Sequence, residues 1–417
     1  MKLGIVSCYF INNYGSVLQA YALQEYFSSK GVECDTISVE GLKPYLEAKK
    51  KQYYLCNIHK AGLIFSKLPM IGLKVLQKIN YKNLGRRHRE RVRKFDDFRK
   101  NFHLSDERAT SLEQFTDLSV KYDTVVVGSD QLWRPDNLFP EYYTLSWVPD
   151  HIPKVSYATS FGVAELDNRD QARARSFLNR LSAISVRESS GCDLVKKLTG
   201  KTPDIVCDPV FLLTKDQWNR LADTSCCPGQ KYIFTYFLGD GKECRKFAEK
   251  LSAVTGFPVL GVIHNDSYIA SDEKLEYPIA SCSPNEFLGL ISNAEYVCTD
   301  SFHATAFSTI FHKKFFAFNR FQSQKYGTNS RLGSFLKMTG LENRLIKNPR
   351  EAEKIVLNDI DYETVNHKVF SFINKSCDFI EREILQGESG NAQEKDFASQ
   401  PDEKHRRDRF FSEKLME

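Results

Sequence analysis

Short apolar segments that end at small or polar residues recur along this chain, and helical patterns follow most of them. The first covers residues 3–10, a polar loop follows at 11–15, and apolar residues then recur at helical spacing up to Gly31. A second apolar segment at 32–39 completes a strand, loop, helix and strand unit. Because parallel strands need a long crossover, this unit predicts an α/β fold with a parallel sheet.

The same pattern returns at residues 122–208 and, after a crossing segment at 208–229, in the second half of the chain. For 417 residues this predicts two doubly wound, Rossmann-like α/β domains that face a cleft. We expect the following organisation: a first domain at 1–208 with a helical insertion at about 40–121, a second domain at 209–345, a helical segment at 346–386, and a polar, disordered tail at 387–417.

The insertion contains a strongly basic stretch at residues 83–103. A solvated amphipathic helix accounts for it, with the apolar side chains of Val92, Phe95, Phe98 and Phe102 turned inward. The alternative is attraction to an anionic membrane face or an anionic acceptor. A net charge of +5 is too small for a dedicated nucleic-acid binder, so we expect no nucleic-acid partner.

Cysteine usage and hydropathy point to a cytoplasmic protein. The eleven cysteines are scattered and odd in number, and no CxxC pair occurs, which favours reduced thiols over a disulfide scaffold or zinc ribbon. The start of the chain, MKLGIVSCYF, is typical of a strand rather than of a signal peptide. Polar residues interrupt the longest apolar stretch, 61–79, before it reaches the length of a membrane span.

In open α/β sheets, ligands bind beyond the carboxyl ends of the strands, so the loops there are candidate sites. The first such loop contains Asn13 and Gly15 before a helix, where free N–H groups attract anions and glycine permits close approach. A polar turn capped by Ser16 is the structural alternative. Neither GxGxxG nor a P-loop sequence occurs, which disfavours classical dinucleotide and nucleoside triphosphate sites.

Two further loops follow strong strand patterns. Gly128, Ser129 and Asp130 come after the strongest strand, and Ser160 comes after the strand at 154–158. The small residues leave room for a ligand, and we expect these four residues to line the cleft or contact the acceptor. A tight turn with a helix cap would explain the same residues without a ligand.

Arg187 stands at the end of the strand expected at 183–186. A guanidinium group there is suited to a carboxylate or phosphate, because its donors bind two oxygens at once. The alternative is a structural ion pair with Glu188 or a surface acid.

The segment at 299–305 places Asp300, Ser301 and His303 where an apolar strand gives way to a helix. A histidine exchanges protons near neutral pH, so His303 is a candidate catalytic residue, although isolated histidines are often structural. We also take Asp300 as a catalytic candidate. No HExxH, GxSxG or close Asp/His metal cluster occurs, and we expect no metal and no cofactor.

Six segments in this order make the chain resemble the polysaccharide pyruvyl transferase family over residues 1 to about 345, with the basic region unplaced. They are NNYGSVLQAYAL, VVVGSDQLWRP, SYATSFG, ISVRE, VCDPVFLL and YVCTDSFHATAFSTIFHKKFFAF. The resemblance implies two Rossmann-like domains of the GT-B kind. It also implies transfer of a pyruvyl group from phosphoenolpyruvate to sugar hydroxyls, giving a ketal on a bacterial surface glycan or its lipid-linked precursor.

The resemblance assigns roles residue by residue. The arginine that binds phosphoenolpyruvate falls on Arg187, the catalytic histidine falls on His303, and the N-terminal turn facing the cleft falls on Asn13 and Gly15. Many members carry Arg-Leu-His-Gly where this chain has Ser301-Phe302-His303-Ala304, so a second anion-binding arginine is missing at Ser301. Of the downstream cations, Arg331 is our preferred substitute, which makes Ser301 and Arg331 candidate donor-binding positions.

In the implied reaction, protonation of the enol methylene carbon creates an oxocarbenium-like centre that a sugar hydroxyl attacks, and phosphate leaves. His303 would supply or remove a proton, and either Asp130 or Asp300 would activate the acceptor hydroxyl. The partners expected are phosphoenolpyruvate, a glycan or lipid-linked saccharide, and an anionic membrane surface at the inner face, contacted by the basic helix. Two alternatives stay open: a GT-B glycosyltransferase that uses a nucleotide sugar, and a catalytically silent glycan-binding protein.

Overall fold

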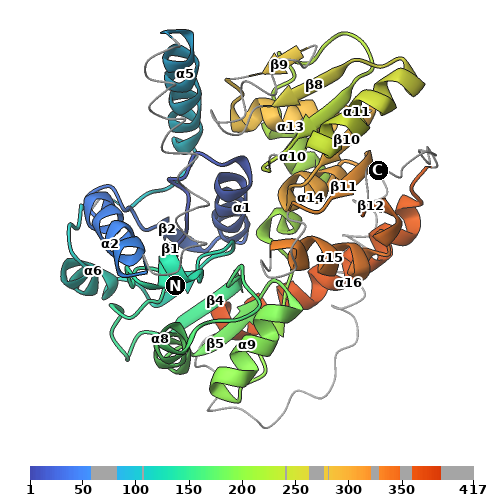
Figure 1. The fold of residues 1–417 in the computed structure, drawn as a ribbon. Helices are drawn as coiled ribbons and strands as arrows, with labels where there is room; N and C mark the ends of the chain where they lie inside the picture. The colour runs from blue at the N-terminus through green and yellow to red at the C-terminus, as the bar shows by residue number, and fades with distance from the viewer. Residues whose placement is uncertain are drawn as a thin grey trace.

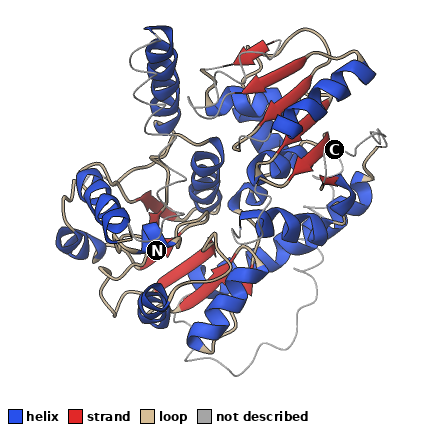
Figure 2. Cartoon of the chain, in the orientation of Figure 1, coloured by secondary structure: helices blue, strands red, loops and turns tan. Residues whose placement is uncertain are grey.

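Two parallel β-sheets organise the chain, each flanked by helices (Figure 1, Figure 2). The computed structural model describes residues 1–57, 82–105, 108–239, 242–262, 277–279, 281–320, 328–347 and 359–386. The tail expected at 387–417 lies outside the described residues, as does part of the helix expected from 351 onward. No helix in the described part of the chain combines the length and apolar character that crossing a membrane requires.

The first sheet has the strand order β2-β1-β3-β4-β5-β6, and every neighbouring pair is parallel. Its strands are β1 (Lys2–Val6), β2 (Glu33–Thr36), β3 (Thr124–Val127), β4 (Lys154–Thr159), β5 (Ala183–Val186) and β6 (Asp204–Ile205). The central strands are buried on both sides, because helices cover both faces of the sheet. The helices of this half are α1 (Tyr14–Ser29), α2 (Lys43–Cys56), α5 (Lys82–Arg99), α6 (Leu112–Ser119), α7 (Pro135–Leu138), α8 (Asn168–Asn179) and α9 (Ser189–Thr199).

The second sheet has the order β12-β11-β10-β7-β8-β9, again all parallel. Its strands are β7 (Ile233–Tyr236), β8 (Val259–Val262), β9 (Tyr277–Ile279), β10 (Tyr296–Thr299), β11 (Lys314–Phe318) and β12 (Leu345–Ile346). The order of the six strands is that of the dinucleotide-binding Rossmann fold. The helices that follow the first domain are η1 (Pro209–Leu212), α10 (Lys215–Leu221), α11 (Lys242–Thr255), α13 (Pro284–Ser292), α14 (Phe302–Ile310), α15 (Thr328–Thr339), η3 (Glu342–Arg344), α16 (Tyr362–Ile380) and η4 (Glu381–Leu385).

Both sheets have a topological switch point, where the order of the strands reverses. It lies between β1 and β3 in the first sheet and between β7 and β10 in the second. Ligands of open α/β sheets bind at such points, outside the carboxyl ends of the strands. The predicted fold class, two Rossmann-like domains in a GT-B-like arrangement, is therefore confirmed.

The C-terminal helix α16 returns to the first domain (Figure 1). Its Ser376 hydroxyl accepts a hydrogen bond from the backbone N–H of Cys207 at 2.8 Å. In the following helix η4, Arg382 pairs with Asp204 of β6 at 3.0 Å. The end of the described chain thus ties the second domain to the edge of the first sheet.

The basic helix α5 packs against both domains. Its Phe95, Phe98 and Phe102, the last just beyond the helix, are buried, as the sequence pattern predicts, whereas Val92 is only partly buried. Lys94 pairs with Glu286 of α13 at 2.7 Å. Arg99 donates hydrogen bonds to the carbonyl oxygens of Tyr9 and Phe10 in the loop after β1. Part of the basic character therefore serves internal contacts, and contact with a membrane stays a prediction.

Candidate active site

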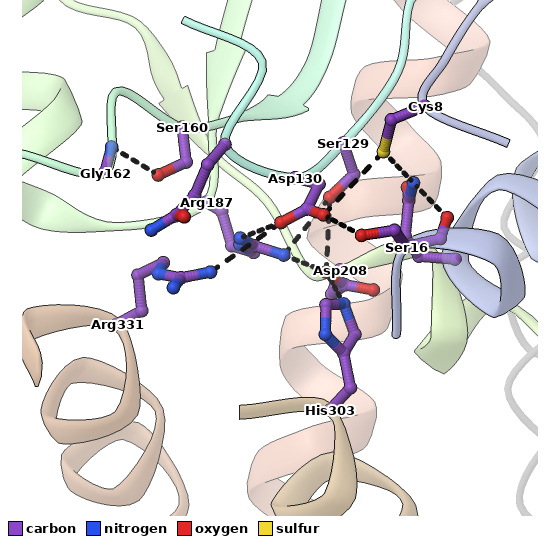
Figure 3. Close-up of polar contacts among 12 residues, drawn as sticks. Cys8, Ser16, Ser129, Asp130, Ser160, Gly162, Arg187, Asp208, His303 and Arg331 are labelled. Atoms are coloured by element: carbon purple, nitrogen blue, oxygen red, sulfur yellow. Dashed lines mark hydrogen bonds and ion pairs between the residues drawn. The ribbon is translucent and has the colours of Figure 1, made fainter. Parts of the chain in front are cut away.

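Charged side chains from both domains meet between the two sheets (Figure 3). Asp130 follows β3, Arg187 follows β5 and Asp208 follows β6, all at the carboxyl edge of the first sheet. His303 of α14 and Arg331 of α15 reach this edge from the second domain. We call these five residues the interdomain charge cluster. Four of them are buried, and Asp130 is partly exposed.

Arg187 is the centre of the interdomain charge cluster. Its guanidinium group donates to Asp208 and lies 3.4 Å from Asp130, and its side chain is only 2% exposed. The ring of Phe302 packs against it from the second domain, with 4.8 Å between the guanidinium carbon and the ring centroid. Burial works against its charge, but the neighbouring carboxylates outweigh that effect and raise the pKa of Arg187. Its ion-pair partners are therefore Asp208 and Asp130, and neither is Glu188 or a surface acid, as the structural alternative expected.

Asp130 and Asp208 are held in the ionised state. Burial by itself would raise both pKa values, but the guanidinium group of Arg187 and the imidazole of His303 beside the two carboxylates outweigh it. The pKa of Asp208 falls to about 2, and that of Asp130 falls well below its usual range, where Arg331 also contributes.

The backbone at Asp130 is strained. Its φ of 82° lies in the left-handed region, which non-glycine residues seldom adopt. The Ser16 hydroxyl donates to its carboxylate at 2.6 Å, and Arg331 lies 3.8 Å from the same group. Strain of this kind persists where surrounding contacts enforce it, and it is common at functional sites.

His303 lies against the first domain. Its Nε2 is 3.4 Å from the carboxylate of Asp208, within ion-pair range but without the geometry of a hydrogen bond. A Cβ atom built on Gly15 would lie 2.1 Å from Nδ1 of His303, so only glycine leaves room for the ring there. The close approach expected at Gly15 is thus made by a side chain of the second domain.

Three buried side-chain nitrogens of the cluster have no hydrogen-bond partner among the described residues. They are Nε of Arg187, Nε of Arg331 and Nε2 of His303. Burial and the nearby charge of Arg187 lower the pKa of Arg331 to about 9, which still leaves it charged at neutral pH. Buried donors are almost always satisfied in proteins, so the Nε atoms of Arg187 and Arg331 mark a place where an anionic ligand would supply the acceptors.

The remaining predicted site residues lie around the cluster and make contacts of their own. Asn13 caps α1 by accepting from the N–H of Ser16, so the cap is Asn13 and the expectation of a Ser16 cap is wrong. Ser129 donates to Asp208 at 3.2 Å, and Gly128 packs against Leu23 of α1.

In the second domain, Ser301 caps α14 by accepting from the N–H of Ala304 at 3.4 Å. The carboxylate of Asp300 accepts two backbone N–H groups, from Leu238 at 2.6 Å and from Gly239 at 2.8 Å. Asp300 therefore fixes the loop after β7, and these contacts do not bring its carboxylate into the interdomain charge cluster.

Sequence reasoning missed Asp208 and Glu188. Asp208 follows β6, a strand of only two residues whose pattern is too short to mark it, although the VCDPVFLL segment contains it. Glu188 is buried beside Arg187 and accepts from the Ser160 hydroxyl at 2.6 Å. Among the described residues, no group of three or more His, Cys, Asp or Glu side chains is arranged to hold a metal ion.

A polar groove of about 450 Å³ lies apart from these residues, between α5 and α13. Lys94 and Glu286, which pair across it, are among its lining residues. The groove contains no member of the interdomain charge cluster.

Comparison with known proteins agrees with the sequence resemblance. The family model for polysaccharide pyruvyl transferase matches residues 13–322. A search of curated protein sequences gives no significant match.

Similar solved structures include the UDP-GlcNAc 2-epimerase of Methanocaldococcus jannaschii in complex with UDP-GlcNAc and UDP, at 12% identity, a TM-score of 0.47, and coverage of 93% of this chain and 100% of that one. An alpha-glucosyltransferase in complex with UDP and DNA is similar at 11% identity, a TM-score of 0.45, and coverage of 92% and 95%. The lipopolysaccharide heptosyltransferase II of E. coli follows at 9% identity, a TM-score of 0.37, and coverage of 89% and 99%.

Proposed function

Since the chain belongs to the polysaccharide pyruvyl transferase family, we propose that it transfers a pyruvyl group from phosphoenolpyruvate to two hydroxyls of one sugar. The product would be a cyclic ketal on a surface glycan or its lipid-linked precursor. The observation that carries the proposal is the pair of unsatisfied buried donors on Arg187 and Arg331. Two guanidinium groups from opposite domains suit a small ligand with two anionic groups.

In this proposal Arg187 and Arg331 bind the phosphate and carboxylate of the donor between them. Arg331 takes the place of the family's missing arginine, because Ser301 is engaged in capping α14. Arg187 is fixed by Asp208, Asp130 and the ring of Phe302, so it is oriented before the donor arrives. Fixed cations of this kind also stabilise the charge that develops on departing phosphate.

His303 is the proposed acceptor of the sugar hydroxyl proton. Asp130 is a poor base, because its neighbours hold its pKa well below the usual range, and Asp300 is engaged by two backbone N–H groups. Asp208 lies against Nε2 of His303 and would stabilise the imidazolium that forms. The protein would act on an acceptor presented at the cytoplasmic face of a membrane, which α5 would help to contact.

A titration of thermal stability with phosphoenolpyruvate tests the donor. A ligand that binds only the folded state stabilises it by about 2.7 kcal/mol at a hundredfold excess over Kd. We expect a dose-dependent rise in Tm for the wild type and for an exposed control, Arg169→Ala. Arg331→Ala should weaken binding roughly 30-fold, the equivalent of about 2 kcal/mol.

A panel of nucleotide sugars is titrated in the same thermal-stability assay. Stabilisation by a nucleotide sugar, with none by phosphoenolpyruvate, would favour a glycosyltransferase and refute the proposed donor. Equal binding of phosphoenolpyruvate by the wild type and Arg331→Ala would show that Arg331 does not bind the donor.

A further inference from the structure

Glu188 is a buried carboxyl group whose second oxygen has no hydrogen-bond donor in the described part of the chain. The residue is only 2% exposed, Oε1 accepts from the Ser160 hydroxyl at 2.6 Å, and Oε2 is unsatisfied. Glu188 stands at the N-cap of α9, yet its side chain makes no capping hydrogen bond. The Glu188 side chain therefore does not accept a backbone N–H of the first helical turn, which is the usual structural role of a polar residue at this position.

The charges that face Glu188 come from three elements. Arg187 and Asp130 belong to the first domain, and Arg331 comes from α15. Burial raises the pKa of Glu188, and the two arginines and Ser160 offset only part of that rise. Glu188 differs in this respect from Asp130 and Asp208, whose pKa values are lowered by their direct partners.

The charge balance predicts where a proton would go when an anion binds. Three carboxyl groups, those of Asp130, Glu188 and Asp208, share the site with the guanidinium groups of Arg187 and Arg331. A donor with a phosphate and a carboxylate adds negative charge, which favours uptake of a proton. Asp130 and Asp208 are engaged in direct ion pairs with Arg187, whereas Oε2 of the buried Glu188 has no donor among the described residues, so Glu188 is the carboxyl group that would receive it.

We propose that Glu188 takes up a proton when phosphoenolpyruvate binds and is the acid that delivers it to the methylene carbon of the donor. This inference rests on the proposed function and adds the proton donor to it. The O–H bond of Glu188 breaks as the π electrons of the enol form a C–H bond, which leaves positive charge at the adjacent carbon. The first sugar hydroxyl bonds to that carbon and passes its proton to His303.

The second sugar hydroxyl completes the ketal. Its oxygen forms the second C–O bond as the bond to phosphate breaks, and its proton returns to Glu188. The proton held by His303 goes to the departing phosphate. Two protons leave the sugar, one reaches phosphate and one replaces the proton used at carbon, so the cycle closes without any further reactant.

Calorimetric titration with phosphoenolpyruvate alone tests the proton uptake. Binding enthalpies at pH 7.5 are measured in two buffers that differ in ionisation enthalpy, for the wild type, Glu188→Gln and the exposed control Glu165→Gln. Glutamine keeps an acceptor for Ser160 but does not titrate. We expect the wild type and the control to take up a fraction of a proton for each phosphoenolpyruvate bound. Glu188→Gln should take up none and should bind the donor at least as tightly as the wild type.

The outcomes separate the two proposals. If the wild type does not bind phosphoenolpyruvate, the proposed function fails and the role of Glu188 fails with it. If the wild type binds with proton uptake that Glu188→Gln retains, only the role of Glu188 is overturned. With an acceptor supplied, Glu188→Gln should slow transfer by about 10²-fold or more, the usual contribution of a general acid, without weakening donor binding.

Discussion

Asp130 and Asp300 occupy equivalent places in the two domains, yet their surroundings differ. Each follows a strand at the switch point of its sheet, β3 for Asp130 and β10 for Asp300. Asp300 accepts backbone N–H groups from the neighbouring loop and lies 3.9 Å from Arg320 of its own domain, whereas Asp130 contacts a serine hydroxyl and two arginines, one from each domain. The same position in the same topology therefore serves loop structure in one domain and a charged interdomain site in the other.

The largest effect is expected at Arg187, on which the first-domain site depends. Arg187→Met removes the arginine partner of both Asp208, which is fully buried, and Asp130, and breaking a buried ion pair costs about 3–5 kcal/mol. We expect a loss of that size in the free energy of unfolding, measured with urea, and no binding of phosphoenolpyruvate. Wild-type stability in Arg187→Met would contradict the central position that we assign to this residue.

Gly15 and His303 are in contact, and each lies beside the switch point of its own sheet. Gly15→Ala should disturb this contact. The added methyl group would lie 2.1 Å from Nδ1 of His303, so the ring must move. Displacement of a catalytic group by about 1 Å lowers a rate by roughly 100-fold, measured here as phosphate released from the donor with an acceptor present. Gly229→Ala, where a Cβ meets nothing within 4 Å, is the matched control and should keep the wild-type rate.

The comparison itself is tested by replacing each aspartate with asparagine. Asp300→Asn sets an amide group against the N–H groups of Leu238 and Gly239, and we expect about 1–3 kcal/mol of lost stability with donor affinity unchanged. Asp130→Asn removes negative charge beside Arg187 and Arg331, and donor affinity should rise severalfold. If the two variants showed the same change in thermal stability and the same change in donor affinity, the functional distinction between Asp130 and Asp300 would be wrong.

The smallest expected effect is the contribution of Asp208 to stability in the acid pH range. The pKa of Asp208 is about 2 in the folded state, below the ordinary value of about 3.9. Its contribution is therefore complete above about pH 4 and is lost as the pH falls toward 2. Asp208→Asn should flatten the decline of Tm in this window, and a decline as steep as that of the wild type would argue against the ion pairs.

Local sequence patterns were sufficient for the architecture but only in part for the site. Strand ends and motif order indicate Arg187, His303 and Asp130, and the arginine missing at Ser301 directs attention to Arg331. The structure brings these four residues together. Asp300 looked equally suitable, because a sequence does not show which backbone N–H groups a carboxylate will accept.

Two further features depend on contacts between distant segments. The pairing of Asp208 with His303 joins residues 95 positions apart, and the two-residue strand β6 gives almost no signal in the sequence. Glu188 was visible beside Arg187, but its burial and unsatisfied oxygen emerge only when β4, β5 and α15 are assembled. Their roles, like those of the other site residues, stay predictions.

A crystal structure of the protein with phosphoenolpyruvate tests the central claim most directly. We predict the donor between the two domains, with its phosphate and carboxylate within hydrogen-bond distance, about 3 Å, of Arg187 and Arg331. Its methylene carbon should face Glu188. A donor bound elsewhere, with Arg187 and Arg331 free of it, would contradict the assignment of the interdomain charge cluster as the pyruvyl-donor site.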